Sequence, residues 1–249
     1  MTARKVVVVG AGIVGLAHAW IAAERGCDVT VLERHPQATG ASIRNFGMFW
    51  PIGQPPGLLH DVAMASRARW LRAGREGGIW VNPCGSVHLA HHDDEMQVLR
   101  EFHAIAQQSG IVCELLDRET TAARTPGANR QGLRGSLFSA AEACVNPRRA
   151  IAGLAAWLAT MPNVRIEFSS TATRIGSEEV MTADGRGVAF DLAIVCGGAD
   201  IDTLYPGLDR ELGLRRCKLQ MMRTVPQPPG WKLGTHVASG LTLRSYANF

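Results

Sequence analysis

The chain has 249 residues, of which 46% are hydrophobic and 19% are charged, and its formal net charge is +4. This many apolar side chains can bury a sizeable core, which excludes a disordered tail, a collagen-like fibre and a small disulfide scaffold. The charge surplus is small and no dense basic run contains aromatic residues, so nucleic-acid binding is not indicated. The length allows one large domain or two modest ones.

Two features of the composition bear on the compartment. The six cysteines contain no C-x-x-C pair of the kind that binds zinc or forms a redox dithiol, so we expect reduced thiols, a cytoplasmic protein and no metal site. The apolar run over residues 6–23 has the character of a signal peptide or a membrane span. Its regularly placed glycines instead favour a buried strand, a tight turn and a helix, and therefore no membrane span.

Three glycines follow the strand predicted at residues 6–9 in the pattern G-x-G-x-x-G: Gly10, Gly12 and Gly15. The first glycine permits the turn, the second lets the backbone approach a pyrophosphate, and the third lets helix and strand pack closely. The helix predicted at residues 13–25 would direct its free N–H groups at the anion. The segment predicts an adenine dinucleotide site, and the alternative is a tight turn in an unrelated α/β protein.

A second predicted strand, residues 29–32, is followed directly by Glu33. A carboxylate about 20 residues past such glycines accepts hydrogen bonds from the ribose hydroxyls of a dinucleotide. The first 33 residues therefore form a complete strand-helix-strand unit for nucleotide binding. Glu33 would serve NAD and FAD equally well.

Residues 36–57 are rich in glycine and proline but also contain Arg44, Phe46, Phe49 and Trp50. A long irregular segment in a compact domain is usually functional or disordered, and the aromatic residues argue against disorder. An arginine guanidinium can hold an anionic group, so Arg44 is a candidate to bind the anionic end of a substrate. The alternative is a structural ion pair between Arg44 and a Glu or Asp.

The middle of the chain breaks the strand-helix alternation, which indicates an inserted second domain. Helices are predicted at residues 58–75, 93–109 and 147–160. Strands are predicted at residues 87–90, 112–116, 133–138, 164–168, 172–175 and 192–196. The alternating patterns of residues 217–225 and 241–246 predict two strands of an antiparallel sheet.

Together these segments resemble the FAD-dependent oxidoreductases of the D-amino-acid oxidase, glycine oxidase and sarcosine oxidase family. The matching pieces span nearly the whole chain in the family's order: residues 8–15, 31–34, 39–42, 145–147 and 193–199. Residues 44–47 with 50–57 are similar to a bacterial subgroup associated with aminophosphonate breakdown.

The resemblance implies an α/β (α+β) fold with two domains. A Rossmann-like FAD-binding domain would comprise residues 1–45 and 146–205. An inserted substrate domain with a mixed or antiparallel sheet would comprise residues 46–145 and 206–249. Members of this family continue beyond the position that corresponds to Phe249, so we expect a C-terminally truncated chain with an incomplete substrate domain.

The resemblance also implies which residues bind FAD. The first glycine turn would lie at the pyrophosphate, Glu33 and Arg34 at the adenosine ribose, and the loop that follows near the diphosphate and flavin ring. These cofactor-binding residues are Gly10, Ala11, Gly12, Ile13, Val14, Gly15, Glu33, Arg34, Ser42, Arg44, Asn45, Gly197 and Gly198.

The implied reaction is oxidation of the C–N bond of a small amine or amino acid, with an aminophosphonate as one candidate. Hydride passes to flavin N5 and the imine product hydrolyses. The expected partner is this small molecule, with no nucleic acid and no membrane. Two alternatives remain open: a truncated, non-catalytic dinucleotide-binding protein, and an NAD-linked dehydrogenase. The dehydrogenase would require continuous strand-helix alternation over residues 34–120.

Overall fold

The computed structural model describes residues 3–218 and 220–245. The chain divides into two compact units. Unit 1 consists of Met1–Phe46, Glu76–Ile79 and Asn146–Met221, and unit 2 consists of Gly47–Arg75, Trp80–Val145 and Met222–Phe249. The predicted FAD-binding domain, residues 1–45 and 146–205, lies within unit 1.

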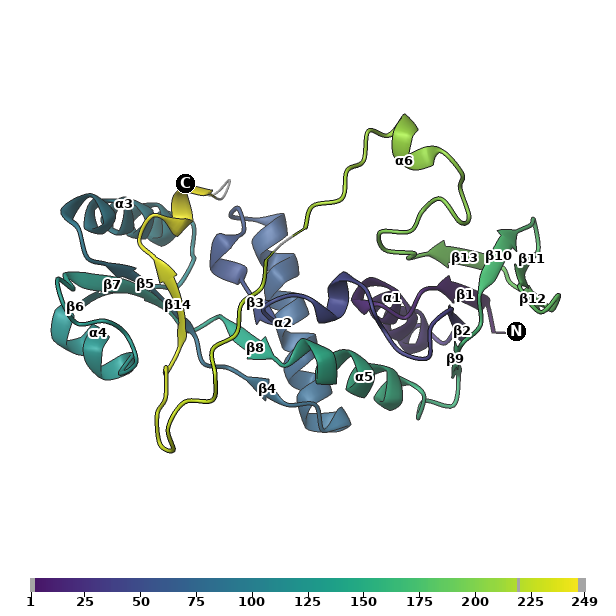
Figure 1. Ribbon diagram of the computed structural model, residues 1–249, viewed down its shortest axis with the longest axis horizontal. Helices are drawn as coiled ribbons and strands as arrows, with labels where there is room; N and C mark the ends of the chain where they lie inside the picture. The colour runs from purple at the N-terminus through teal and green to yellow at the C-terminus, as the bar shows by residue number, and fades with distance from the viewer. Residues whose placement is uncertain (1–2, 219, 246–249) are drawn as a thin grey trace. The chain divides into compact units, whose positions relative to one another are not determined.

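Unit 1 contains a parallel sheet, a small antiparallel sheet and the helices that follow their strands (Figure 1). The strands are β1 (Lys5–Val9), β2 (Asp28–Glu33), β9 (Val164–Phe168), β10 (Ala172–Ile175), β11 (Glu179–Thr182), β12 (Gly187–Ala189) and β13 (Leu192–Val195). The helices are α1 (Ile13–Glu24), η1 (Ala41–Ile43), α5 (Pro147–Leu158) and α6 (Leu208–Glu211). The elements predicted in this unit up to β13 are confirmed to within a residue or two.

The parallel sheet has the strand order β13-β1-β2-β9, and every neighbouring pair is parallel. The four valines of β1 are buried because neighbouring strands flank it and both faces of the sheet are covered. The order reverses at β1, since β2 and β9 lie on one side of it and β13 on the other. The carboxyl ends of β1 and β13 therefore form the topological switch point, where open α/β sheets bind ligands.

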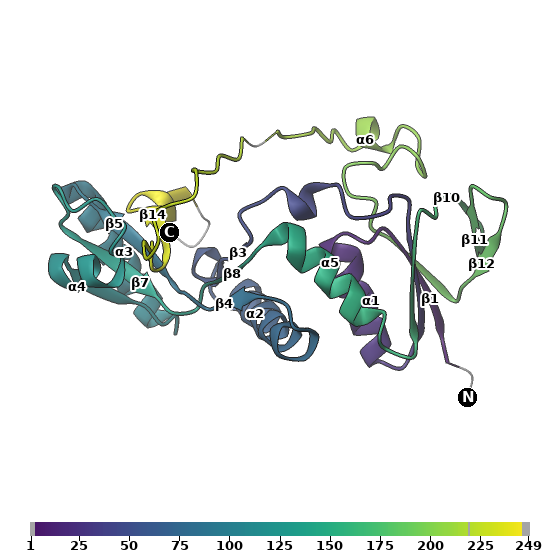
Figure 2. The ribbon, with the colours of Figure 1, turned by 60° about the horizontal axis from the view of Figure 1, so that its bottom comes forward.

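The two faces of this sheet have different covers. Helices α1 and α5 lie on one side and strands β10, β11 and β12 on the other (Figure 2). The two helices meet through an edge-to-face contact of Trp20 and Trp157, whose ring centroids are 4.8 Å apart. On the opposite face, Val7 and Leu32 share a buried cluster with Val180 of β11. Both covers exclude water from the strands that carry the glycine turn.

Unit 2 contains two further sheets. Its strands are β3 (Met48–Phe49), β4 (Val81–Asn82), β5 (Ser86–Ala90), β6 (Glu114–Asp117), β7 (Gly135–Ser139), β8 (Ala143–Val145) and β14 (His236–Ser239). Its helices are η2 (Pro51–Gly53), α2 (Leu58–Gly77), α3 (Asp93–Gln108), α4 (Arg118–Arg124) and η3 (Thr242–Ser245), and the last two residues of α2 are assigned to unit 1. The sheet orders are β14-β5-β7-β6 and β3-β8-β4.

The main core of unit 2 lies between α3 and the larger sheet. Leu99 and Phe102 of α3 pack with Leu137 of β7, and all three are at most 1% exposed. The apolar residues of α3 recur at helical spacing, so one stripe of the helix faces the sheet. Leu243 of η3 is also fully buried in this cluster and fixes the later segment of the chain against it.

Two strand predictions near the end of the chain are wrong. Residues 217–218 and 220–225 lie outside any helix or strand, and residue 219 lies outside the described residues. In the predicted strand 241–246, residues 242–245 form the short helix η3, and residue 246 lies outside the described residues. The strand that the structure has near here is β14, which pairs with β5 in parallel. An alternating pattern marks a strand only where a neighbouring strand completes its hydrogen bonds, and burial of Leu243 suits the short helix equally well.

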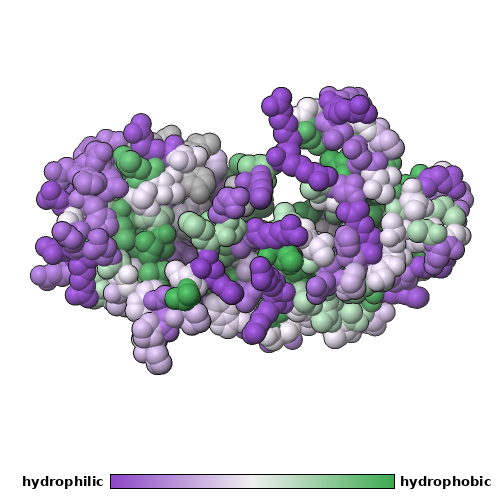
Figure 3. Space-filling view, viewed as in Figure 1, coloured by the Kyte–Doolittle hydropathy of each residue, from purple (hydrophilic) through white to green (hydrophobic). Residues whose placement is uncertain are grey.

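None of the helices in the described part of the chain is both long enough and apolar enough to span a membrane. On the face drawn in Figure 3, hydrophilic side chains predominate and hydrophobic residues form small separate groups.

Candidate functional site

The candidate site begins with the tight turn at the carboxyl end of β1. Gly10 has a φ of +105°, and a Cβ at this position would collide with the carbonyl oxygen of Cys196. A Cβ on Gly15, in the first turn of α1, would collide with the carbonyl oxygen of Gly10. Position 10 therefore requires glycine because of its backbone conformation. Position 15 requires glycine because the helix and the turn approach each other closely.

The N-terminus of α1 opens from this turn without a cap from its own N-cap residue. Gly12 is the N-cap, and the first turn of the helix contains no acidic residue. The Ser42 hydroxyl accepts a hydrogen bond of 2.9 Å from the Ile13 N–H, and a Cβ on Gly12 would lie 3.0 Å from that hydroxyl. The positive end of the helix dipole thus has no carboxylate of its own, which leaves it suited to an external anion.

Glu33 ends β2 beside the same turn and is only 9% exposed. Its carboxylate accepts hydrogen bonds from the backbone N–H groups of Ala11, at 2.9 Å, and His35, at 3.0 Å. These bonds fix the carboxylate and the glycine turn relative to each other. Each carboxylate oxygen retains lone-pair capacity, so the side chain can still accept hydrogen bonds from a ligand hydroxyl.

A second glycine turn follows β13 on the other side of the switch point. The Cys196 N–H donates to the Val9 carbonyl at 2.7 Å, which holds the ends of β13 and β1 together. Gly198 has a φ of +67°, and a Cβ on Gly197 would lie 2.7 Å from the Asp200 carbonyl oxygen. Both predicted glycine turns therefore meet at one sheet edge.

Arg34 makes an interaction that the sequence did not predict. Its guanidinium forms an ion pair with Asp200, which lies just after the second glycine turn. Hydrogen bonds from Thr203 and then from Arg34 lower the pKa of the Asp200 carboxyl below its ordinary value. Arg34 thus joins the end of β2 to the loop after β13. Sequence separation concealed this partner, because no local pattern connects the two segments.

Asn45 and Arg44 follow η1. The Asn45 amide donates to the carbonyl oxygens of Ala41 and Ser42, both at 3.0 Å, and so holds the short turn that carries Ser42. Arg44 is exposed, and none of the ion pairs among the described residues includes it. Its backbone N–H donates to the Ala41 carbonyl oxygen at 3.0 Å, which fixes the backbone of this turn.

The aromatic residues of the same loop lie in different surroundings. Phe46 is 69% exposed. In unit 2, Phe49 stacks on Trp70 with ring centroids 5.3 Å apart, and Trp50 lies 5.2 Å from the ring of His88. Burial lowers the pKa of His88 to about 4, and neither ring nitrogen has a hydrogen-bond partner among the described residues. His88 is therefore neutral at pH 7 and belongs to the core.

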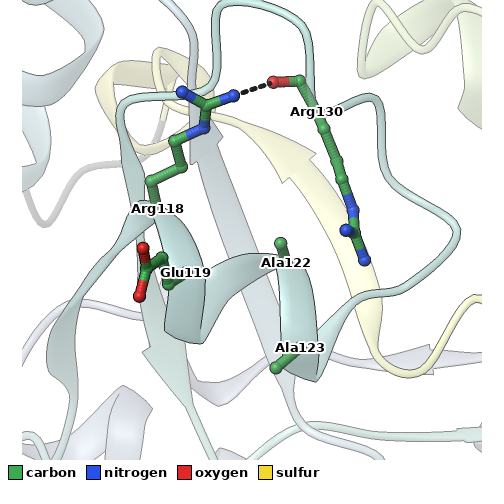
Figure 4. Close-up of a pocket in the computed structure, with 5 residues that line it drawn as sticks. All are labelled: Arg118, Glu119, Ala122, Ala123 and Arg130. Carbon is green, nitrogen blue, oxygen red and sulfur yellow. Dashed lines mark hydrogen bonds between the residues drawn. The ribbon is translucent and has the colours of Figure 1, made fainter.

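A separate hollow lies on unit 2, between α4 and the loop after it (Figure 4). The Arg118 guanidinium donates to the Arg130 carbonyl oxygen at 3.4 Å across its mouth. The residues that line it are Arg118, Glu119, Ala122, Ala123 and Arg130. No residue predicted for the cofactor lies there, so this hollow is distinct from the glycine turns.

The arrangement in unit 1 fits an adenine dinucleotide. Two glycine turns leave room for a backbone approach, a helix N-terminus without a cap from its own N-cap residue faces the turn, and a buried carboxylate lies beside it. These are the requirements of pyrophosphate and ribose binding at a topological switch point.

The sequence is similar to a known family and to known proteins. The family described as FAD dependent oxidoreductase matches residues 5–246. The tRNA 5-methylaminomethyl-2-thiouridine biosynthesis bifunctional protein MnmC of Pseudomonas aeruginosa (strain UCBPP-PA14) is 31% identical over 245 residues, which are 95% of this chain and 36% of that protein. The protein of the same name from Burkholderia lata is 33% identical over 148 residues, 54% of this chain and 22% of that protein.

Solved structures share the fold at lower identity. Glycine oxidase from Bacillus cereus has a TM-score of 0.68 and 21% identity, over 79% of this chain and 57% of that one. L-amino acid deaminase from Proteus vulgaris has a TM-score of 0.70 and 21% identity, over 85% and 56%. FAD-bound L-alpha-glycerophosphate oxidase from Mycoplasma pneumoniae has a TM-score of 0.67 and 20% identity, over 97% and 66%. This chain spans only part of each relative.

Proposed function

Because this chain belongs to the family of FAD-dependent oxidoreductases, we propose that unit 1 binds FAD at its two glycine turns and that the protein oxidises the C–N bond of a small amine or amino acid. One observation carries the cofactor assignment: the glycine turns and Glu33 meet at a single switch point of the parallel sheet. The substrate class rests on Arg44 and on relatives that act on amino acids by name.

The proposed roles of the cofactor-binding residues follow from their hydrogen bonds. The backbone at Gly12 and the N-terminus of α1 would hold the diphosphate, and Ser42 would keep that loop in place through Ile13. The Glu33 carboxylate would accept hydrogen bonds from the ribose hydroxyls, while the hydrogen bonds from the Ala11 and His35 N–H groups keep it oriented. Arg34 would act indirectly, because its guanidinium is paired with Asp200.

When bound, FAD supplies the hydride acceptor for the substrate carbon beside the nitrogen. The chain contributes position: Arg44 would hold the anionic end of the substrate and so direct the C–H bond at the acceptor. The reaction requires an unprotonated amine but no obligatory acid or base from the protein. The Arg44 guanidinium is exposed and has no ion-pair partner among the described residues, which supports this role over the alternative of a structural pair.

The substrate proposal is tested by loading the chain with FAD and adding single amines without oxygen. We expect loss of the visible flavin absorbance with at least one of glycine, sarcosine, alanine of either hand, or aminomethylphosphonate. Reduction by the aminophosphonate alone would support the narrower subgroup. FAD binding without reduction by any amine would instead favour the non-catalytic dinucleotide-binding alternative.

A second candidate substrate is an amine carried on a tRNA nucleoside. The Pseudomonas relative, 31% identical over 95% of this chain, is named for the biosynthesis of 5-methylaminomethyl-2-thiouridine in tRNA. The same flavin assay, with bacterial tRNA in place of the free amines, separates the two candidates. Reduction by tRNA and not by free amines would favour the nucleoside.

A further inference from the structure

Unit 2 brings together three side chains from distant parts of the sequence: Cys84, Cys144 and His236. One possible ligand atom from each lies within 4.8 Å of the other two, and all three residues are half-buried. Cys84 lies between β4 and β5, Cys144 on β8, and His236 at the start of β14. The cluster therefore lies where the two sheets of unit 2 adjoin.

The spacing suits a small tetrahedral metal ion. With metal–sulfur bonds of about 2.3 Å and metal–nitrogen bonds of about 2.0 Å, ligand atoms around zinc lie roughly 3.5–3.8 Å apart. Atoms that already lie within 4.8 Å need to move by only about 1 Å to close on an ion. Two thiolates and one imidazole form a donor set that prefers zinc over magnesium or calcium.

The surroundings of the cluster orient His236. The Nε2 of His236 lies 3.2 Å from the Ala143 carbonyl oxygen, and because that oxygen only accepts, Nε2 must carry the proton. Nδ1 then holds the lone pair, which is the second-sphere arrangement found for metal-bound histidines.

The nearby carboxylate is already engaged. Glu142 is fully buried, and its two oxygens accept hydrogen bonds of 3.0 Å from the Ile52 N–H and the Ser86 hydroxyl. Cys84, Cys144 and His236 are the three protein ligands that the described residues bring together, and a fourth position would be filled by water.

We propose that Cys84, Cys144 and His236 bind one zinc ion that clamps β14 and β8 to the loop before β5. Binding releases the two thiol protons and leaves the oxidation state of every atom unchanged. The site lies in unit 2 and is independent of the proposed function of the glycine turns in unit 1. No local sequence pattern indicates this metal site, because its ligands come from three separate segments rather than from a C-x-x-C pair.

The test uses the full chain, reduced, freed of metal with a chelator and titrated with Co²⁺ as a visible probe. We expect one Co²⁺ per chain, thiolate-to-metal charge-transfer absorption and displacement by Zn²⁺. If the reduced wild-type chain shows no thiolate-to-metal charge-transfer absorption after Co²⁺ is added, the proposal is overturned. So would a Cys84–Cys144 disulfide, mapped by mass spectrometry, in protein that binds no Co²⁺ after reduction.

Variants assign the ligands. Cys144→Ser and His236→Gln should each weaken Co²⁺ binding by about 100-fold or more, since each removes one of three protein ligands. Cys113→Ser is the matched control, because Cys113 is another half-buried free thiol of unit 2 outside the cluster. Equal binding by the control and the ligand variants would overturn the assignment. If a ligand variant fails to fold, the wild-type Co²⁺ spectrum decides.

Discussion

Replacing Glu33 with Gln tests the geometry of the nucleotide site most sharply. The carboxylate accepts the Ala11 N–H at 2.9 Å through one oxygen and the His35 N–H at 3.0 Å through the other. Glutamine has nearly the same shape but only one acceptor oxygen, and its other terminal atom is a donor. One of the two backbone N–H groups must therefore face an NH₂ group.

The substitution should change both the free energy of unfolding and the Kd for FAD. An unsatisfied buried donor costs about 1–3 kcal/mol, so the free energy of unfolding of the FAD-free chain should fall by that amount. Hydrogen bonds to a charged acceptor contribute about 1.5–3 kcal/mol and neutral ones about 0.5–1.5 kcal/mol. Loss of the charge should therefore weaken each ribose bond by about 1–1.5 kcal/mol, which raises the Kd for FAD roughly tenfold for every such bond that Glu33 accepts.

The assays are urea unfolding without FAD and FAD titration followed by flavin fluorescence. Asp28→Asn is the control, because Asp28 is exposed at the opposite end of β2 and the substitution removes the same charge. It should leave the Kd for FAD within about twofold, since exposed surface substitutions change little. An unchanged Kd in Glu33→Gln, or an equal loss in Asp28→Asn, would refute the role of the Glu33 carboxylate.

Three further predictions concern other parts of the chain. Gly15→Ala should lower Tm and abolish tight FAD binding, because its Cβ collides with the Gly10 carbonyl. Gly176→Ala is the control and should do neither in the same titration, because its Cβ would lie in ordinary contact, 3.4 Å from the Glu179 carbonyl oxygen. Arg44→Lys should raise KM for an anionic amine by about tenfold in steady-state kinetics, because lysine cannot form the bidentate pair. The Kd for FAD, measured by titration, should stay unchanged. An equal rise of KM and of the Kd for FAD would argue against Arg44 as a substrate anchor. The folded-state pKa of His88 is lowered from 6.5 to about 4, because burial disfavours the charged imidazole. The free energy of unfolding should therefore fall by about 3 kcal/mol as the pH drops from 6.5 to 4, and should not depend on His88 above pH 6.5. His88→Phe should flatten that part of the pH profile measured by urea unfolding, and an unchanged slope would contradict the prediction.

The sequence was sufficient to predict the first nucleotide-binding unit because its signals are local. Gly10, Gly12 and Gly15 lie within one turn and one helix start, and Glu33 ends the adjacent strand, so spacing alone brings them together. The strand order β13-β1-β2-β9 then brings the second glycine turn to the same edge.

Long-range pairs escaped prediction for the opposite reason. Arg34 meets Asp200, and Cys84 meets Cys144 and His236, only after the chain has folded, and no periodic pattern encodes such contacts. The alternation at residues 217–225 indicated a strand, yet none forms among its described residues, because the pattern carries no information about a partner strand.

We propose that this chain uses FAD to oxidise the C–N bond of a small amine. The most direct measurement is a single anaerobic turnover of the FAD-loaded chain, in which reduced flavin and released carbonyl product are both quantified. We predict one carbonyl product per reduced flavin with at least one small amine or amino acid. A chain that is saturated with FAD yet yields neither reduced flavin nor carbonyl product with any small amine would contradict the claim.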